Sequence, residues 1–187
     1  VHDLSALQIQ LAGRYLEQGK LLAYPTESVW GLGCDPYNSA AVLRMLQIKD
    51  RPVEKGVILV ISDVSQIAPL FRSLSAKQQT KITQDHSDPI TWLIPDPDNL
   101  IPPWIKGDHQ TVAIRLSQHP TVQALCREFG KPIVSTSANH SGQTAIKSRI
   151  KLFNEFAGKI DFFVAGILGS EKKPSQIRDL LTGEIIR

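Results

Sequence analysis

The stretch from Ser39 to Ile61, SAAVLRMLQIKDRPVEKGVILVI, joins a helical pattern directly to a strand pattern. Val42 and Leu46 fall on one helical face, which predicts a helix over residues 39–48. Residues 57–61 are all β-branched or leucine, and such an unbroken apolar run is typical of a strand covered on both faces. The stretch therefore predicts an α/β domain whose sheet is flanked by helices.

Helix and strand patterns alternate along the rest of the chain. Further helices are predicted from an N-cap at Asp3 to a stop at Gly19, and at 75–84, 120–130 and 148–157. Further strands are predicted at 21–24, 90–94, 112–116, 133–134 and 162–165, followed by a terminal hairpin of 177–180 with 184–186. The Pro- and Asp-rich residues 95–103 are expected to form a long surface loop. We expect one domain over residues 1–187, built on a twisted open mixed parallel/antiparallel sheet with flanking helices.

The composition is that of a globular protein, because 42% of the 187 residues are hydrophobic and 21% are charged. No apolar run approaches the roughly 18 residues of a membrane span, so no membrane association is expected. Cys34 and Cys126 lie far apart without metal-ligand spacing, which indicates reduced thiols, a cytoplasmic protein and no metal ligated by the protein. The net charge of +3 permits RNA binding through a local patch but does not predict it.

Residues 24–35, YPTESVWGLGCD, follow a predicted strand with hydroxyls, a carboxylate and two glycines. Hydroxyls at the end of a strand can hold a ligand, and glycines let the backbone approach it closely. The same residues also suit an ordinary capped turn, so both interpretations stay open. A P-loop motif is absent, and Pro36 stands where a dinucleotide-binding fingerprint would need its third glycine.

Residues 49–56, KDRPVEKG, place three cations between a helix end and a buried strand. Arg can grip a phosphate or carboxylate with two parallel hydrogen bonds, and Lys adds a point charge. The segment is therefore a candidate anion receptor. Lys49 could equally complement the dipole of the preceding helix, and runs of charge are commonly solvated.

Two later strands carry polar residues that could complete an anion site. Arg115 interrupts the apolar run 112–116 and needs an anion, either from the fold or from a ligand. Residues 133–142, IVSTSANHSG, lead from a strand into polar and small residues, the pattern of a phosphate-cradling loop without the Walker spacing. Ser135 and Ser137 could instead cap the next helix.

Taken together, these segments resemble the threonylcarbamoyl-AMP synthase family, the YrdC-like domain. The resemblance covers nearly the whole chain, from the YPTE run at 24–27 to the PSQIRD run at 174–179. It is carried by the KxR pair at 49–51 with Lys55-Gly56, by Arg115 with His119-Pro120, and by the SxN pair at 137–139. The resemblance implies a twisted open sheet with a concave, positively charged face, as in the short bacterial members without a second domain.

The family resemblance also implies a reaction, in which L-threonine, bicarbonate or CO2 and ATP give threonylcarbamoyl-adenylate and pyrophosphate. The product serves the modification of adenosine 37 in tRNA, through other proteins of the threonylcarbamoylation pathway and with a possible contact to tRNA itself. Lys49 and Arg51 are then the catalytic residues. ATP, with Mg²⁺, is assigned to Lys49, Arg51, Thr111, Ser137, Asn139 and Arg187. L-Threonine is assigned to Thr26, Lys55, Arg115, Ser135 and Ser175.

One loop departs from the family pattern, and two other functions stay open. Residues 86–89, HSDP, stand where the family often has Trp-Pro-Gly-Pro, so the turn chemistry there differs. A non-catalytic RNA-binding module would use the basic charge alone, although no RNA-recognition signature is present. The carbamoyl-transfer domain of hydrogenase maturation looks similar, but it is joined to domains with zinc-type cysteines. His119 and His140 are expected to be structural, and the sequence nominates no general base.

Overall fold

A computed structural model describes residues 5–171 and 174–186. Within these ranges, eight strands form one open sheet in the order β7-β1-β2-β6-β3-β5-β4-β8. The strands are β1 Leu22–Pro25, β2 Trp30–Gly33, β3 Ile58–Ile61, β4 Ile90–Pro95, β5 Thr111–Leu116, β6 Ile133–Ser137, β7 Phe162–Phe163 and β8 Gln176–Asp179. Three pairs are parallel, β1–β7, β3–β5 and β4–β8, and the others are antiparallel. The predicted mixed α/β sheet is confirmed.

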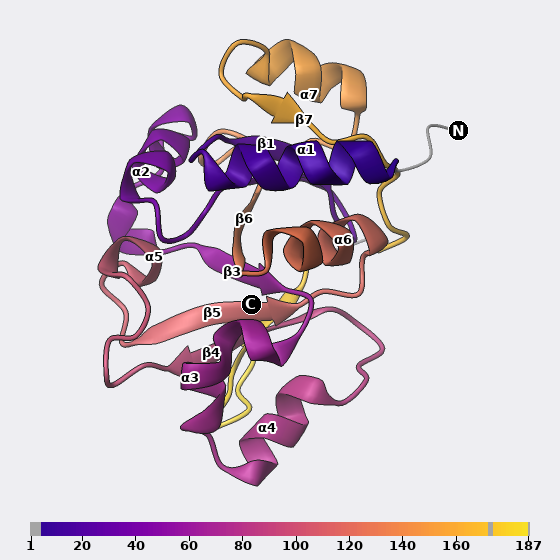
Figure 1. Cartoon of the computed structure of the whole chain (residues 1–187). Helices are drawn as coiled ribbons and strands as arrows, with labels where there is room; N and C mark the ends of the chain where they lie inside the picture. The colour runs from indigo at the N-terminus through magenta and orange to yellow at the C-terminus, as the bar shows by residue number, and fades with distance from the viewer. Residues whose placement is uncertain (1–4, 172–173, 187) are drawn as a thin grey trace.

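Helices cover both faces of the sheet (Figure 1). They are α1 Ala6–Glu17, α2 Ser39–Ile48, α3 Ala68–Arg72, α4 Ala76–Thr83, α5 Pro103–Lys106, α6 Pro120–Phe129 and α7 Arg149–Phe156, with short 3-10 helices η1 Val53–Lys55 and η2 Val64–Ile67. In β3, Val60 packs into the core beneath α1 and α6, whereas Leu59 and Ile61 point to the larger core on the other face. This alternation explains why residues 57–61 show no polar position.

Local capping sets the ends of the helices. The predicted capping box of Ser75 and Gln78 begins α4, and Gly130 ends α6 in the left-handed region at φ 71°. The prediction that Asp3 caps the first helix was wrong, because α1 begins at Ala6 and the Ser5 side chain accepts a hydrogen bond from Gln8 N. Asp3 itself lies outside the described residues.

β2 was not predicted as a strand. Residues 30–33 pair with β1 on one side and β6 on the other, so β1 and β2 form a hairpin. A Trp-Gly-Leu-Gly run has little intrinsic preference for a strand, and pairing on both sides holds it extended. Residues 26–29, TESV, form the connection between β1 and β2.

The contacts test the predicted terminal hairpin and the predicted surface loop at 95–103. The terminal hairpin is present, because Asp179 N donates to Glu184 O and Ile186 N donates to Ile177 O, while β8 also joins β4 in parallel. The expectation of a surface loop over 95–103 was wrong at Asp96. This carboxylate is fully buried and pairs with Lys106 at 3.0 Å, which pins the loop to α5.

Candidate active site

Strand register gathers the polar runs on one face of the sheet. The paired residues are Gly31 with Ser137, Ile58 with Ser135 and Val60 with Arg115. Residues paired across neighbouring strands project to the same face, which here is the face that α1 and α6 cover in part. Small and hydroxyl side chains from separate segments therefore meet on the remaining part of this face.

Two adjoining hollows, of about 180 and 240 Å³, lie on this face and share Arg51, Val57 and Ile58 as lining. Six hydroxyl side chains line the first hollow: Thr26, Ser28, Ser135, Thr136, Ser137 and Ser175. Apolar side chains dominate the second, which we call the apolar hollow: Val57, Ile58, Leu93, Ile105, Ala113, Ile177 and Ile186. The site therefore has a hydroxyl-rich end and an apolar end, with Arg51 between them.

Arg115 lies buried in the hydroxyl-rich hollow beside a carboxylate of the fold. Its Nη2 is 3.5 Å from Glu27 Oε2, and its Nη1 donates to Ser175 Oγ at 3.3 Å. The buried Nε of Arg115 finds no acceptor among the described residues. Glu27 is thus the anion that the sequence left undetermined. Because a guanidinium has five donor hydrogens, Arg115 retains capacity for a ligand.

Glu27 is held in its charged form. Burial raises the pKa of this carboxyl, but the charge of Arg115 and a hydrogen bond from Ser117 Oγ at 2.5 Å outweigh burial and bring the pKa below its usual value. Ser117 Oγ in turn accepts from His119 N at the start of α6. The orientation of Arg115 is therefore tied to the β5–α6 connection.

The other hydroxyls of this hollow are also held in place. Thr26 Oγ1 donates to Val29 O at 2.7 Å across the hairpin connection, which leaves its oxygen free to accept. Ser175 Oγ lies 2.8 Å from Thr91 Oγ1, as well as accepting from Arg115. Both side chains can therefore offer a fixed hydrogen-bonding atom to a ligand.

Lys49 is the C-cap of α2, and its ammonium group is buried rather than solvated. Its Nζ donates to the carbonyl oxygen of Ser137 and, at 2.6 Å, to that of Asn139. Burial, together with the nearby charge of Arg51, lowers the pKa of Lys49 to about 8. Lys49 is not among the residues that line either hollow, and its ammonium group instead contacts the loop that follows β6.

Arg51 lines both hollows. Its Nη2 and Nε donate to Gly56 O at 2.8 and 3.2 Å, and Nη2 also lies 3.3 Å from Lys55 O. These acceptors come from the end of η1, which wraps around the guanidinium. The K-x-R pair is therefore divided between a buried lysine that organises a loop and an arginine at the junction of the two hollows.

The loop after β6 is fixed by its own polar groups. Ser137 Oγ donates to Asn139 Oδ1 at 2.6 Å, and Asn139 Nδ2 donates to Gln143 O at 2.7 Å. Ser135 and Ser137 belong to β6, whereas Ser148 caps α7, so the alternative that the two serines cap the next helix was wrong. Ser137 faces the hydroxyl-rich hollow, and Asn139 supports it.

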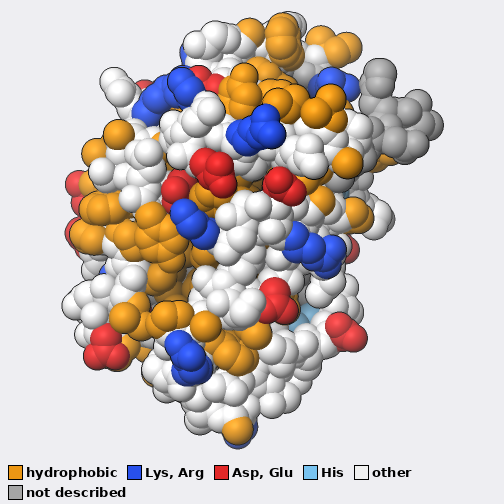
Figure 2. All heavy atoms as spheres, viewed as in Figure 1, with side chains coloured by type: hydrophobic (Ala, Val, Ile, Leu, Met, Phe, Trp, Pro, Cys, Tyr) orange, Lys and Arg blue, Asp and Glu red, His pale blue; other side chains and the backbone are white. Residues whose placement is uncertain are grey.

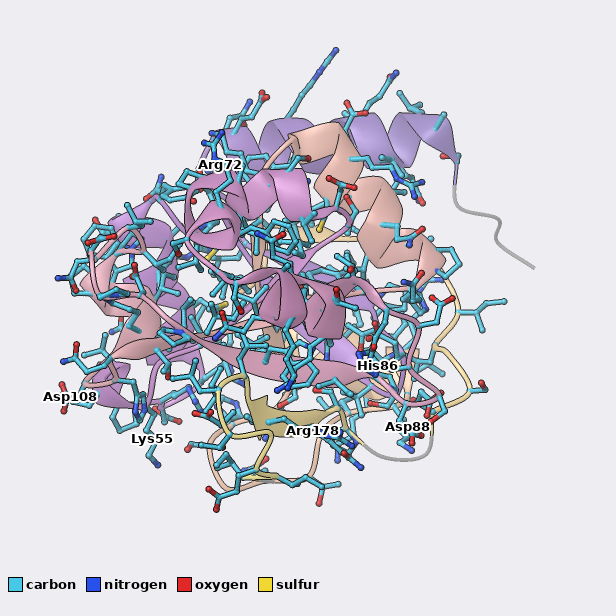
Figure 3. The ribbon with its side chains drawn as sticks, turned by 90° about the horizontal axis from the view of Figure 1, so that it is seen from below. Lys55, Arg72, His86, Asp88, Asp108 and Arg178 are labelled. Atoms are coloured by element: carbon cyan, nitrogen blue, oxygen red, sulfur yellow. The ribbon has the colours of Figure 1, made fainter. Side chains whose placement is uncertain are left out.

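The remaining residues that the sequence assigns to ATP or threonine lie at the apolar hollow or outside the described residues. Thr111 and Lys55 both line the apolar hollow, so Lys55 is separated from the other residues assigned to threonine. Figure 3 shows Lys55 on the same side as Asp108, whose backbone N–H bonds to Glu54 O, and far from His86. Arg187 lies outside the described residues.

A third hollow of about 280 Å³ lies beside Glu27 and is lined by the loop that departs from the family pattern. His86 and Asp88 of this loop lie together at one end of the molecule in Figure 3. His119 closes the hollow near α6, and burial lowers its pKa, which favours a neutral ring. None of the residues assigned from the sequence is among its lining residues. The altered loop thus shapes a neighbouring surface.

Sequence reasoning missed Glu27, Ser28 and Thr136. All three stand inside runs that were singled out, yet Glu27 is far along the chain from its partner Arg115, so local sequence does not show the pairing.

Figure 2 shows Lys and Arg interspersed with Asp and Glu on the face that carries α1 and α6, so a continuous basic surface is absent from that view.

A family model for Sua5, YciO and YrdC proteins, described as "Telomere recombination", matches residues 14–187. The chain belongs to the Sua5/YciO/YrdC family. The K-x-R segment, the Arg115 strand and the loop after β6 all lie within the matched range. No helix in the described ranges is long and apolar enough to cross a bilayer.

Relatives and solved structures agree with this membership of the Sua5/YciO/YrdC family. A threonylcarbamoyl-AMP synthase of Pseudomonas putida KT2440 is 45% identical over 184 residues, which cover 98% of each chain. The structure of P. abyssi Sua5 complexed with L-threonine superposes with a TM-score of 0.86 at 28% identity, over 95% of this chain but only 52% of that one. The chain thus spans about half of Sua5. E. coli YciO superposes with a TM-score of 0.81 at 22% identity, over 98% of this chain and 89% of YciO, and shows the shared fold alone.

Proposed function

We propose that this Sua5/YciO/YrdC protein is a threonylcarbamoyl-AMP synthase. It would join L-threonine, bicarbonate or CO2 and ATP into L-threonylcarbamoyladenylate and release pyrophosphate. Relatives of the same length at 45% identity bear that name. The observation that carries the proposal is Arg115, a buried guanidinium with an unsatisfied Nε in a hydroxyl-lined hollow that adjoins an apolar one.

The hydroxyl-rich hollow suits the amino acid. Arg115 would bind the threonine carboxylate, which supplies the acceptor that Nε lacks. Thr26, Ser135 and Ser175 would hold the amino and hydroxyl groups, since each is buried at the wall of this hollow. Lys55, assigned to threonine by the family resemblance, suits the nucleotide end better because it lines the apolar hollow.

The junction and the apolar hollow suit ATP. Arg51 and Ser137 would bind phosphates, and Thr111 would contact the nucleoside, whose base fits among apolar side chains. Lys49 and Asn139 would position the phosphate-binding loop. Arg187 is assigned to ATP by the resemblance alone.

Mg²⁺ would enter as part of the substrate MgATP. Neither hollow has a carboxylate among its lining residues, and no group of three His, Cys, Asp or Glu side chains in the described ranges could hold a metal ion. The triphosphate oxygens would therefore supply the ligands that Mg²⁺ prefers.

The proposed reaction needs positioning and neutralisation of charge rather than an enzyme nucleophile. The threonine ammonium first loses protons to solvent, and its nitrogen bonds to the carbon of CO2 to give a carbamate. A carbamate oxygen then bonds to the α-phosphorus of ATP while the α–β phosphoanhydride bond breaks and pyrophosphate leaves. Arg51 would offset the charge that develops on the phosphates, and the fixed hydroxyls would hold the carbamate in line.

The adenylate would then serve the modification of adenosine 37 in tRNA. An acyl-type phosphate anhydride hydrolyses readily, so transfer to other proteins of the pathway in the cytoplasm is part of the proposal. Contact with tRNA at this chain is also proposed from the family resemblance, and the net charge of +3 permits it.

Pyrophosphate release tests the proposed function. The protein is incubated with ATP, Mg²⁺, threonine and bicarbonate, and each is omitted in turn. Release should require threonine and bicarbonate together, because the carbamate formed from both is the nucleophile. Equal release after omission of either one would reject the synthase, and RNA binding without release would favour a non-catalytic module.

A further inference from the structure

His140 connects the two motifs of the proposed ATP site. It follows Asn139 in the loop after β6, and its ring lies between carboxylates from two other segments. Nε2 is 3.0 Å from Glu155 Oε1 on α7, and Nδ1 is 3.4 Å from Asp50 Oδ2 in the K-x-R segment, a charge contact in which the buried Nδ1 makes no hydrogen bond within the described residues. The ring also stacks on Phe156 at a centroid distance of 5.7 Å.

The partner in the K-x-R segment has an unusual backbone. Asp50 has φ 51°, a left-handed conformation that non-glycine residues rarely adopt. This turn separates Lys49, which points into the protein, from Arg51, which lines the hollows. A contact between the Asp50 side chain and His140 therefore bears on the geometry of both cations.

The same loop is already joined to the K-x-R segment through backbone groups. Ser141 N donates to Lys49 O at 2.8 Å, and Lys49 Nζ binds the carbonyl groups of Ser137 and Asn139. These bonds hold the inner side of the loop. His140 is the side chain that reaches outward from the loop to α7.

We propose that His140 is a positioning residue for ATP, which clamps the loop 137–143 between Asp50 and Glu155. This inference rests on the proposed function, because it takes Ser137 and Arg51 as phosphate ligands. His140 lines neither of the two hollows, so its effect is transmitted through the loop and not through contact with substrate. Arg115 lies on β5 and Ser175 just before β8, outside the clamped loop, so binding of the threonine carboxylate should depend on the clamp less than binding of ATP does.

The test compares ATP and threonine dependence in His140→Ala. Loss of the contacts from the His140 ring to two partly exposed carboxylates and to Phe156 should together change ATP affinity by about three- to tenfold. The apparent KM for ATP should rise by that factor, and the KM for threonine should stay within about twofold. Glu155→Gln, and Asp50→Asn, whose asparagine tolerates the left-handed backbone, should each raise the KM for ATP less.

Two controls separate positioning from a loss of folding. His86→Ala removes an equivalent half-buried imidazole, which contacts Lys81 O and Trp92, and it should leave the KM for ATP unchanged. In a double-mutant cycle, His140→Ala should cost less in the Glu155→Gln background than in the wild type. Additive effects, or equal rises of both KM values, would overturn the clamp.

Calorimetric titration of the full chain with ATP makes the outcome independent of turnover. Wild-type protein that binds ATP but releases no pyrophosphate would reject the proposed function, while weaker ATP binding by His140→Ala would still support the clamp. Unchanged ATP affinity in a folded His140→Ala variant would overturn the clamp and leave the proposed function standing. Wild-type protein that fails to bind ATP would reject both.

Discussion

Arg115→Lys is the substitution that best separates substrate binding from stability. The lysine keeps one positive charge opposite Glu27, which lies 3.5 Å from the guanidinium. It cannot keep the bond to Ser175 Oγ and also present two parallel donors to a threonine carboxylate. The substitution therefore removes directional hydrogen bonds while it preserves the sign of the charge.

The expected loss follows from the bonds that disappear. Hydrogen bonds to charged groups contribute about 1.5–3 kcal/mol each, so losing one or two should cost about 3 kcal/mol in the transition state. That corresponds to a fall of roughly 150-fold in kcat/KM for threonine. The KM for ATP should change less than about threefold, because Arg115 does not line the apolar hollow.

The free energy of unfolding should fall much more when the positive charge at position 115 is removed than when it is kept. Arg115→Lys should lower the free energy of unfolding by about 1 kcal/mol. Arg115→Met leaves the Glu27 carboxylate buried without its counter-charge and should cost about 3–5 kcal/mol. Chemical denaturation of both variants measures the difference.

A matched control is available on α2. Arg44 pairs with Asp161 at 2.6 Å, and Arg44→Lys makes the same chemical change away from the lining of both hollows. Threonine kinetics should be normal in Arg44→Lys. A folded Arg115→Lys variant with normal threonine dependence would refute the assignment and leave Arg115 as a partner of Glu27 alone.

Three further predictions concern buried polar groups and a close backbone contact. The pKa of Lys49 is lowered to about 8, so its ammonium group loses a proton as pH rises through that value. Calorimetry at about pH 7 and 9 should therefore show weaker ATP binding at the higher pH. Lys49→Met should abolish this difference between the two pH values. Burial raises the pKa of Asp96, but hydrogen bonds from backbone N–H groups and the charge of Lys106 outweigh burial and bring the pKa below its usual value. The ionised Asp96 therefore stabilises the folded protein above the unfolded pKa of about 4, and this stabilisation is lost as pH falls from there through the lower pKa of the folded state. Asp96→Asn should cost about 3 kcal/mol at neutral pH and flatten the acid limb of denaturation; an unchanged acid limb would mean that other carboxylates control it. Gly33→Ala places a Cβ against the Val134 carbonyl and should lower stability by about 1–3 kcal/mol in a thermal melt, whereas an unaltered melting temperature would require β2 to shift freely.

Elements with strong local signals could be predicted from the sequence. The α2 and β3 pair follows from the apolar periodicity of residues 39–48 and 57–61, and the capping box at Ser75 gave the start of α4. β2 could not be predicted, because its extended form depends on partners at both edges rather than on its own glycine-rich residues.

The candidate site was predictable in composition but not in geometry. Hydroxyl-rich runs and lone cations marked segments that line the two hollows, because loops that follow strands commonly present polar side chains at a sheet end. The roles of individual cations depend on long-range contacts. Lys49 is buried by carbonyl groups from the loop after β6, and Arg115 is paired by Glu27 from the hairpin connection. Local sequence contains neither contact.

Mass spectrometry of the product tests the central claim most directly. The protein is incubated with ATP, Mg²⁺, threonine and isotope-labelled bicarbonate, and the quenched mixture is analysed at once, because the expected adenylate hydrolyses readily. The proposed synthase predicts an adenylate that contains threonine and carries the isotope label in its carbamoyl carbon, formed in step with pyrophosphate. An adenylate without the label, or ATP consumption that yields only ADP and phosphate, would contradict it.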